Sequence, residues 1–234
     1  MSEQVRERLA QIHERMVRAA TRAGRKAEDI TLIAVSKTLD PAAVQRAVEA
    51  GVRNLGENRV QEAASKIPQV HGQGLRWHLI GHLQSNKART AVSLFDVIHT
   101  VDSPRLAARL DDLAGEAGRR LVALVQVDLG GEPAKSGAEP SELPGIIEVL
   151  DNADNLDFRG LMTMPPFFED PERTRDYFRR LREIMEDLNR GRAPDRRLTD
   201  LSMGMSHDFE VAIEEGATMV RVGTAIFGKR EKPL

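Results

Sequence analysis

The sequence predicts an α/β protein built as one closed (β/α)8 barrel of the TIM type, with an additional helix before the first strand. Eight apolar or β-branched runs alternate with helix-like segments along the whole chain, an order typical of a parallel sheet covered by helices. The length of 234 residues is also usual for a barrel of this kind in a single domain. A doubly wound open sheet stays an alternative, because a strand count does not establish closure.

The predicted strands are short runs separated by helical start and stop signals. Asp40-Pro41 opens a helix that closes at Gly51, while Ser103-Pro104 and Asp170-Pro171 open two more. No repeat, low-complexity tract or long linker marks a boundary, so residues 1–234 are expected to form one domain. The strands are predicted at residues 31–37, 52–56, 76–81, 96–101, 121–128, 158–163, 198–203 and 218–222.

Two predicted helices carry apolar residues at helical spacing and should pack on the sheet through that stripe. The stripe of the N-terminal helix consists of Val5, Leu9, Ile12 and Met16. The stripe of the helix that follows Asp170-Pro171 consists of Phe178, Leu181, Met185 and Leu188.

Composition narrows the functional classes. A net charge of -2 and a pI near 6.3 argue against general binding to nucleic acids or anionic membranes. Absence of cysteine excludes disulfides, thiolate catalysis and thiolate metal sites. The N-terminus is charged where a secretory signal is apolar, and no apolar stretch approaches the roughly 20 residues of a membrane span. A soluble cytoplasmic protein is therefore expected.

A lysine and a cluster of small residues form the main functional signal. Lys37 ends the apolar run 31–37, and partial desolvation of a lysine lowers its pKa and frees the amine to attack a carbonyl. The runs 202–206 and 221–224 are rich in glycine, serine and threonine, which suits a phosphate cradle. Since the last strand of a barrel pairs with the first, the two features become neighbours. An aldehyde that carries a phosphate satisfies both.

Other polar residues have simpler interpretations. Ser206 is a plausible N-cap for the helix through Phe209, and Asp208 is assigned to the same helix N-terminus. His78 and His82 are four residues apart, but they lie in a strand-like run that breaks any helical face, so we do not expect them to bind a metal. A lysine at a strand end is usually solvated, so a chemical role is expected for Lys37 only because the cradle accompanies it.

Six segments together resemble the pyridoxal phosphate homeostasis proteins of the YggS and PROSC type, which are relatives of the alanine racemase N-terminal barrel. The resemblance extends from about Leu32 to Gly228 in the same order, and the combination is far more specific than any one motif. The segments are Ala34-Val35-Ser36-Lys37-Thr38, Leu55-Gly56-Glu57-Asn58, Trp77-His78-Leu79-Ile80-Gly81-His82-Leu83-Gln84, Gly160-Leu161-Met162, Leu201-Ser202-Met203-Gly204-Met205-Ser206 and Val220-Arg221-Val222-Gly223-Thr224.

The resemblance implies a pyridoxal 5'-phosphate (PLP) site. Lys37 would form the covalent aldimine, and Asn58 would lie beside the ring. Arg221 would face the pyridine nitrogen, and a permanent cation there keeps that nitrogen unprotonated. A neutral pyridine is a weak electron sink. The phosphate would be held by Ser206, Gly223 and Thr224.

The resemblance also implies a role in buffering or delivering PLP inside the cell, without efficient catalysis. Alanine racemases need a second acid/base, a tyrosine from another domain, whereas Tyr177 of this chain lies in a surface helical pattern. The chain is expected to act as a monomer, with apo forms of PLP-dependent enzymes as partners. Lys135, Lys229 and Lys232 are candidates for a transfer route, although Leu39 stands where relatives often carry a second basic residue.

Two alternatives from other classes stay open. One is a slow PLP-dependent amino-acid racemase that uses Lys37 with His82 or water. The other is a Schiff-base aldolase acting on a sugar phosphate, because a barrel lysine next to a phosphate cradle also serves that chemistry.

Overall fold

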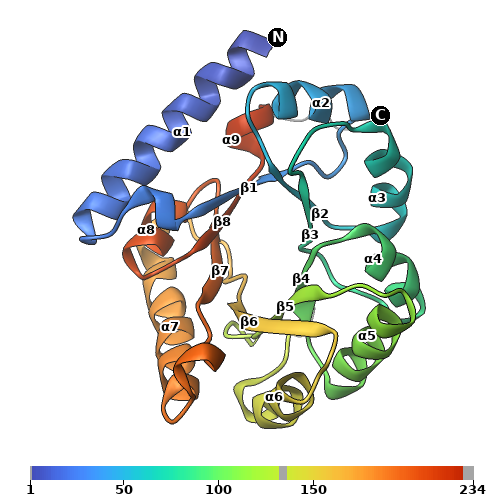
Figure 1. The fold of residues 1–234 in the computed structure, drawn as a ribbon. Helices are drawn as coiled ribbons and strands as arrows, with labels where there is room; N and C mark the ends of the chain where they lie inside the picture. The colour runs from blue at the N-terminus through green and yellow to red at the C-terminus, as the bar shows by residue number, and fades with distance from the viewer. Residues whose placement is uncertain (1, 132–135, 229–234) are drawn as a thin grey trace.

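The computed structural model describes residues 2–131 and 136–228 and shows a closed barrel of eight parallel strands (Figure 1). Each strand pairs with its neighbours along the chain, and β8 pairs in parallel with β1, which closes the barrel and rules out the open sheet. The predicted strand ends lie within about two residues of those observed. The strands are β1 (Thr31–Val35), β2 (Asn54–Glu57), β3 (Arg76–Leu79), β4 (Val97–Val101), β5 (Leu121–Gln126), β6 (Leu156–Met162), β7 (Asp200–Met205) and β8 (Met219–Val222).

Helices form a ring outside the strands (Figure 1). Those on the described residues are α1 (Ser2–Arg22), α2 (Pro41–Glu49), α3 (Val60–Lys66), α4 (Ala88–Leu94), α5 (Pro104–Glu116), α6 (Leu143–Asp151), α7 (Arg175–Asn189), α8 (Phe209–Glu214) and α9 (Thr224–Phe227). Short 3-10 turns are η1 (Ala27–Asp29), η2 (Ile67–Gln69), η3 (Ser85–Lys87), η4 (Pro140–Glu142), η5 (Pro171–Thr174) and η6 (Pro194–Arg196).

The predicted helix starts have the expected caps. The Asp40 carboxylate accepts a hydrogen bond from the Ala43 N–H at 2.6 Å, and the Ser103 hydroxyl accepts one from the Leu106 N–H at 3.3 Å. Asp170 caps η5, and α7 begins only after that turn. Proline follows each cap at a position where a missing N–H costs no hydrogen bond.

Strand side chains alternate between the helix layer and the barrel interior. The large core lies between strands and helices, where Ala34 and Leu55 are fully buried. A second, small cluster of Ile33, Val97 and Leu124 with Met219 lies on the opposite strand faces and therefore fills the interior. The interior also holds buried polar side chains, and these determine much of the site described below.

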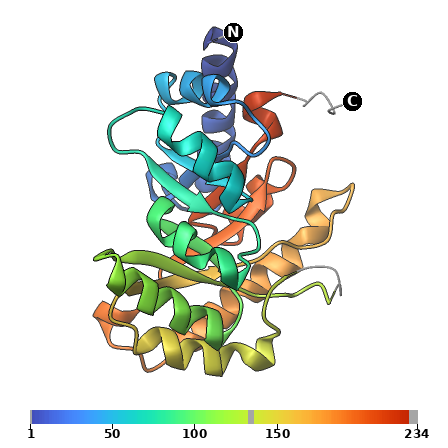
Figure 2. The same ribbon diagram turned by 90° about the vertical axis from the view of Figure 1, so that its right-hand side faces the viewer.

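The additional N-terminal helix is present and belongs to the helix layer. Ile12 and Met16 of α1 are each 2% exposed, while Val5 and Leu9 pack partly buried against the same core, as the predicted stripe requires. Figures 1 and 2 both place α9 beside α1, and the guanidinium of Arg8 donates to the Ile226 carbonyl at 3.4 Å.

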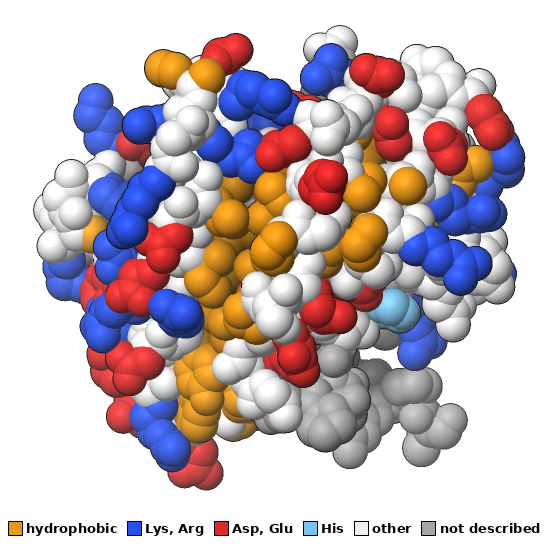
Figure 3. All heavy atoms as spheres, turned by 90° about the horizontal axis from the view of Figure 1, so that it is seen from below, with side chains coloured by type: hydrophobic (Ala, Val, Ile, Leu, Met, Phe, Trp, Pro, Cys, Tyr) orange, Lys and Arg blue, Asp and Glu red, His pale blue; other side chains and the backbone are white. Residues whose placement is uncertain are grey.

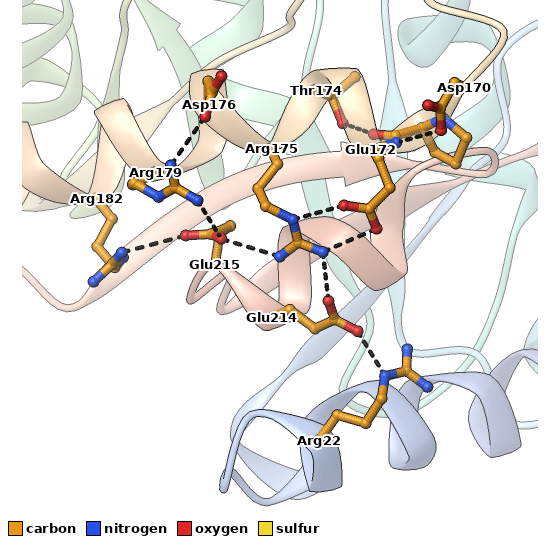
Figure 4. A network of polar contacts seen from close by, with 11 residues as sticks. Arg22, Asp170, Glu172, Thr174, Arg175, Asp176, Arg179, Arg182, Glu214 and Glu215 are labelled. Carbon is orange, nitrogen blue, oxygen red and sulfur yellow. Dashed lines mark hydrogen bonds and ion pairs between the residues drawn. The ribbon is translucent and has the colours of Figure 1, made fainter.

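An ion network centred on Arg175 connects three helices (Figure 4). Its guanidinium contacts Glu172 at 2.8 Å, Glu214 at 2.7 Å and Glu215 at 3.0 Å, and Glu214 also contacts Arg22 of α1 at 2.6 Å. The hydrogen bonds to Glu172 and Glu214 raise the pKa of Arg175 above its ordinary value, so the group stays charged. The network holds α1 and α7 against α8, the helix that leads into β8.

A cavity of about 520 Å³ lies between α6 and the C-terminal end of α7. Its lining includes Ile147 of α6 together with Leu188 and Ala193. In the view from below, hydrophobic side chains gather in a stripe with charged residues on both sides (Figure 3). Within residues 2–131 and 136–228, no helix combines the length and apolarity needed to cross a membrane.

Candidate functional site

One cavity of about 350 Å³ gathers all six residues that the sequence assigns to a site. These residues follow, or end, strands that are neighbours in the closed barrel, so the carboxyl ends of the strands bring them together. We call it the Lys37 cavity. Its lining includes Lys37, Asn58, Ser206, Arg221, Gly223 and Thr224, together with Val35, Ile80, Met164, Phe167, Met205 and His207.

Lys37 stands on a turn just beyond β1 and is half-buried. The strand ends at Val35, two residues before the predicted end, so the lysine belongs to the turn that follows the strand. Thr38 has a φ of 64°, in the left-handed region that a β-branched residue rarely adopts. A strained residue of this kind persists only where its surroundings hold it. The N–H of Thr38 donates to the Glu62 carboxylate.

A buried ion cluster of Lys66, Glu57 and Glu62 holds this turn in place. The Lys66 ammonium, 3% exposed, donates to the Ser36 carbonyl at 2.7 Å and contacts Glu57 at 2.6 Å and Glu62 at 2.9 Å. The Ser36 hydroxyl donates to the same Glu57 oxygen at 2.6 Å. Backbone groups on both sides of Lys37 are thereby tied to α3. Burial raises the pKa of Glu57, and its hydrogen bonds with Lys66 and Ser36 oppose that rise.

On the opposite side of the cavity, two turns are joined by a hydrogen bond. The Ser206 hydroxyl oxygen, after β7, accepts from the Gly223 N–H, after β8, at 3.1 Å. Near the end of β7, Gly204 has a φ of +88°, and a Cβ there would lie 2.5 Å from the Ala212 Cβ, so only glycine fits this position. Ser206, Gly223 and Thr224 all line the cavity, and their hydroxyl and amide groups suit a phosphate, to which the Gly223 N–H could turn from Ser206.

The prediction that Ser206 caps α8 is wrong. Asp208 occupies the N-cap position, and the Ser206 hydroxyl turns to Gly223 instead. Asp208 does stand at the helix N-terminus as expected, but its carboxylate accepts from the Met205 N–H at 2.6 Å and does not cap the helix. Burial raises the pKa of Asp208, and the Met205 hydrogen bond opposes the rise.

Arg221 places a buried cation at the cavity. Its side chain is 3% exposed and donates to the Ser202 hydroxyl oxygen at 2.7 Å and to the Thr163 carbonyl at 2.8 Å. Both acceptors are neutral, and burial lowers the pKa of Arg221 to about 10 while the charge of Asp208 opposes the shift. The guanidinium stays protonated at neutral pH and favours an electron-rich ligand atom.

Apolar side chains supply the walls of the cavity. Val35, Ile80 and Met164 are among these side chains, and Asn58 directly follows β2. The Asn58 backbone passes so close to Gly81 that a Cβ at position 81 would collide with it. This close contact between the two backbones holds Asn58 against Gly81 at the carboxyl end of the barrel.

Sequence reasoning missed Phe167 and His207, which both line the cavity. Phe167 is 74% exposed, and its ring centroid lies 5.4 Å from that of His207, whose Nε2 is 3.0 Å from the Glu169 carbonyl oxygen. His207 directly follows Ser206, so its place beside the predicted cradle was a usable signal. Phe167 comes from the long segment between β6 and η5, whose path no local pattern predicts.

Other residues singled out in the sequence lie elsewhere. His78 is buried inside the barrel, whereas the His82 side chain is 51% exposed and lies 3.3 Å from Asp102. Tyr177 lies on α7 and lines a different cavity with Asp128. Across the described part of the chain, no group of three or more His, Cys, Asp or Glu residues could hold a metal ion. Lys135, Lys229 and Lys232 lie outside the described residues.

Known proteins similar to this chain match it along nearly its whole length. The family model for the alanine racemase N-terminal domain matches residues 8–231. Pyridoxal phosphate homeostasis proteins of Aquifex aeolicus and Escherichia coli are each 42% identical, over 96% and 95% of this chain and 98% and 95% of their own lengths.

Solved structures similar to this chain include a relative of nearly the same length and a more distant racemase. PipY of Synechococcus elongatus, solved with PLP bound, is 43% identical with a TM-score of 0.84 and covers 96% of this chain and 100% of its own. An alanine racemase of Clostridium difficile shares the fold at 16% identity, with a TM-score of 0.69 over 98% of this chain and 58% of its own. The chain belongs to the alanine racemase N-terminal domain family and, within it, to the pyridoxal phosphate homeostasis proteins.

Proposed function

We propose that this protein binds pyridoxal 5'-phosphate in the Lys37 cavity and serves to buffer or deliver it. The observation that carries the proposal is the meeting of an amine, a buried guanidinium and a hydroxyl-amide corner in one cavity of about 350 Å³. The names of the full-length relatives and the PLP bound to PipY support it. PLP supplies an aldehyde, an aromatic ring and a phosphate, and the cavity offers a matching group to each.

The roles of the residues follow from their chemistry. Lys37 holds the aldehyde covalently as a Schiff base, and Asn58 lies beside the ring. Ser206, Gly223 and Thr224 hold the phosphate through hydroxyl and amide groups. The apolar walls exclude water from the ring faces.

The charge of Arg221 favours binding of the cofactor without catalysis. The permanent charge of the guanidinium disfavours a proton on the ring nitrogen, and an unprotonated ring withdraws electrons weakly. A cofactor held in this way is retained without strong activation of an amino acid. We therefore propose that turnover by the purified protein is absent or weak.

A slow amino-acid racemase is the second candidate, and His207 favours it. His207 lines the Lys37 cavity and could serve as a second proton-transfer group, whereas His82 lines a neighbouring cavity. Chiral chromatography of common amino acids after incubation with PLP-loaded protein decides the matter. Robust racemisation that is lost in His207→Ala supports this candidate. Its absence, with cofactor bound, supports the non-catalytic role.

A Schiff-base aldolase for a sugar phosphate is disfavoured, because the relatives' names speak of PLP. We further propose that residues 1–234 act as one domain, as a monomer, in the cytoplasm. Light scattering on the purified protein should give the mass of one chain, 26.0 kDa.

Transfer to an apo-enzyme tests the delivery role. The PLP-loaded protein, freed of unbound PLP, is mixed with an apo form of a PLP-dependent enzyme in the presence of excess phosphatase, which destroys free PLP. We expect reactivation to proceed despite the phosphatase, because the bound cofactor passes directly. Reactivation no faster than spontaneous release would contradict delivery and leave only buffering.

The phosphate corner gives a second prediction. Ser206→Ala and Thr224→Val should each weaken PLP binding by about 1–3 kcal/mol, the value of a hydrogen bond to a charged group. Pyridoxal, which lacks the phosphate, should bind almost unchanged. Titration calorimetry on both ligands gives the comparison, with Ser93→Ala on the exposed side of α4 as the control. Equal losses for both ligands would assign these residues to the fold.

A further inference from the structure

A continuous row of side-chain hydrogen bonds crosses the barrel interior and ends at Arg221. The interior polar row, as we call it, takes one residue from each of β2, β3, β4, β7 and β8. Its successive contacts are Asn54 Oδ1 to His78 Nε2 at 3.0 Å, His78 Nδ1 to His99 Nε2 at 2.9 Å, His99 Nδ1 to Ser202 Oγ at 2.9 Å, and Ser202 Oγ to Arg221 Nη1 at 2.7 Å.

From His78 to Arg221 the row is shut off from solvent, whereas Asn54 at its far end is half-buried. His99 and Ser202 are 0% exposed and His78 is 1% exposed, and strand alternation places them in the interior together with the cluster around Ile33. Burial lowers the pKa of His78 to about 3 and that of His99 well below its usual value. Both rings are therefore neutral, and each has one N–H donor and one bare nitrogen acceptor.

The Arg221 end of the row determines its direction. Arg221 can only donate, so Ser202 Oγ accepts at that contact and has its own proton to give. The Ser202 proton goes to His99 Nδ1, which leaves the proton of that ring on Nε2, where it is donated to His78 Nδ1. His78 then carries its proton on Nε2 and donates it to the Asn54 oxygen.

The opposite direction fails at the Ser202 end. His99 Nδ1–H would donate to Ser202, and the serine proton would then have no acceptor within the row, which is costly for a buried hydroxyl. His78 Nε2 would become an acceptor, and the Asn54 amide would have to turn its NH2 group toward that nitrogen. One arrangement therefore satisfies every contact of the row, with both histidines protonated on Nε2.

We propose that His99 and His78 are positioning residues for Arg221: their fixed tautomers aim the Ser202 oxygen lone pair at the guanidinium and hold it with its donors toward the Lys37 cavity. The effect on the ligand rests on the proposed function, because Arg221 is there the partner of the PLP ring nitrogen. Without the row, the Ser202 hydroxyl can rotate and the guanidinium loses one of its two fixed acceptors.

The first test needs no ligand. Protein labelled with ¹⁵N-histidine is examined by two-bond ¹H–¹⁵N correlation spectra between pH 6 and 9, and His99→Asn serves to assign the His99 ring. We expect both buried rings to be neutral Nε2–H tautomers throughout that range. An Nδ1–H tautomer at His99, or a ring that titrates there, would overturn the proposal even if no PLP ever binds.

The second test compares two replacements at one position. The Asn oxygen in His99→Asn can take the place of Nδ1 and accept from Ser202, whereas His99→Leu offers no acceptor. We expect His99→Asn to keep PLP affinity within about threefold, and His99→Leu to lose roughly tenfold. In His99→Leu, ¹⁵N-labelled PLP should also show a ring nitrogen shifted toward its protonated form.

Equal affinities and equal ring-nitrogen shifts in the two variants would contradict the proposal. If His99→Leu does not fold, the tautomers of the unmutated protein decide. If the unmutated protein binds no PLP, the proposed function is wrong. The tautomer experiment still tests the hydrogen-bond direction along the interior polar row.

Discussion

Lys37→Ala should abolish the covalent attachment of pyridoxal phosphate. Lys37 is the lysine of the cavity lining, so its removal takes away the amine that forms the Schiff base. The hydroxyl-amide corner is intact in the variant, and we expect the cofactor to bind there without a covalent bond. Borohydride reduction followed by peptide mass mapping measures the adduct, and absorbance after gel filtration measures the cofactor retained.

The control for this experiment is Lys26→Ala, which removes an exposed lysine between α1 and β1. It should leave the adduct on Lys37 unchanged. A main adduct on a different lysine in the unmutated protein would overturn the assignment of Lys37.

Lys66→Met should destabilise the protein by about 3–5 kcal/mol at pH 8, since breaking a buried ion pair leaves the remaining charge without compensation. Glu57 is 0% exposed and receives hydrogen bonds from Lys66 and Ser36. Urea unfolding monitored by circular dichroism measures the free energy of unfolding, and Lys26→Met is the matched control.

The loss in the free energy of unfolding of Lys66→Met should be smaller at acidic pH. The pKa of Glu57 is raised by burial, and loss of the Lys66 ammonium raises it further. A carboxyl with a raised pKa in the folded state contributes stability that is full below the ordinary glutamate pKa and is lost as pH rises through the folded-state pKa. Unfolding curves at pH 5 and pH 8 should therefore show a smaller difference from the unmutated protein at pH 5. A difference independent of pH would mean that lost packing, not the Glu57 charge, causes the effect.

The same variant, Lys66→Met, tests whether the buried ion cluster holds Lys37 in position for covalent attachment. The Lys66 ammonium donates to the Ser36 carbonyl, and Glu62 receives the N–H of Thr38. With those ties loosened, Thr38 can leave its left-handed conformation, and the adjoining amine loses its fixed position. The adduct should then form more slowly, even in samples that are fully folded.

Local sequence patterns predicted the barrel and the meeting of Lys37 with the small-residue cradle, and the family resemblance added the roles of Asn58 and Arg221. Alternating apolar runs and caps such as Asp40 and Ser103 depend on neighbours in the chain, so they can be identified without knowing the fold. Each of the six residues lies within two residues of the carboxyl end of a strand, and the carboxyl ends of parallel strands meet on one side of a barrel. Strand order alone therefore predicted that Lys37 and Thr224 share a cavity.

Only the tertiary structure decided the contacts between side chains distant in sequence. His99 and Ser202 are separated by 103 residues, and their meeting depends on strand register and on which side chains face the interior. Ser206 illustrates the same limit: its type and position suit an N-cap, but its oxygen accepts a hydrogen bond from Gly223, just after the next strand. A local pattern shows which bonds a side chain can make, and the folded barrel selects among them by bringing one partner within 3 Å or so.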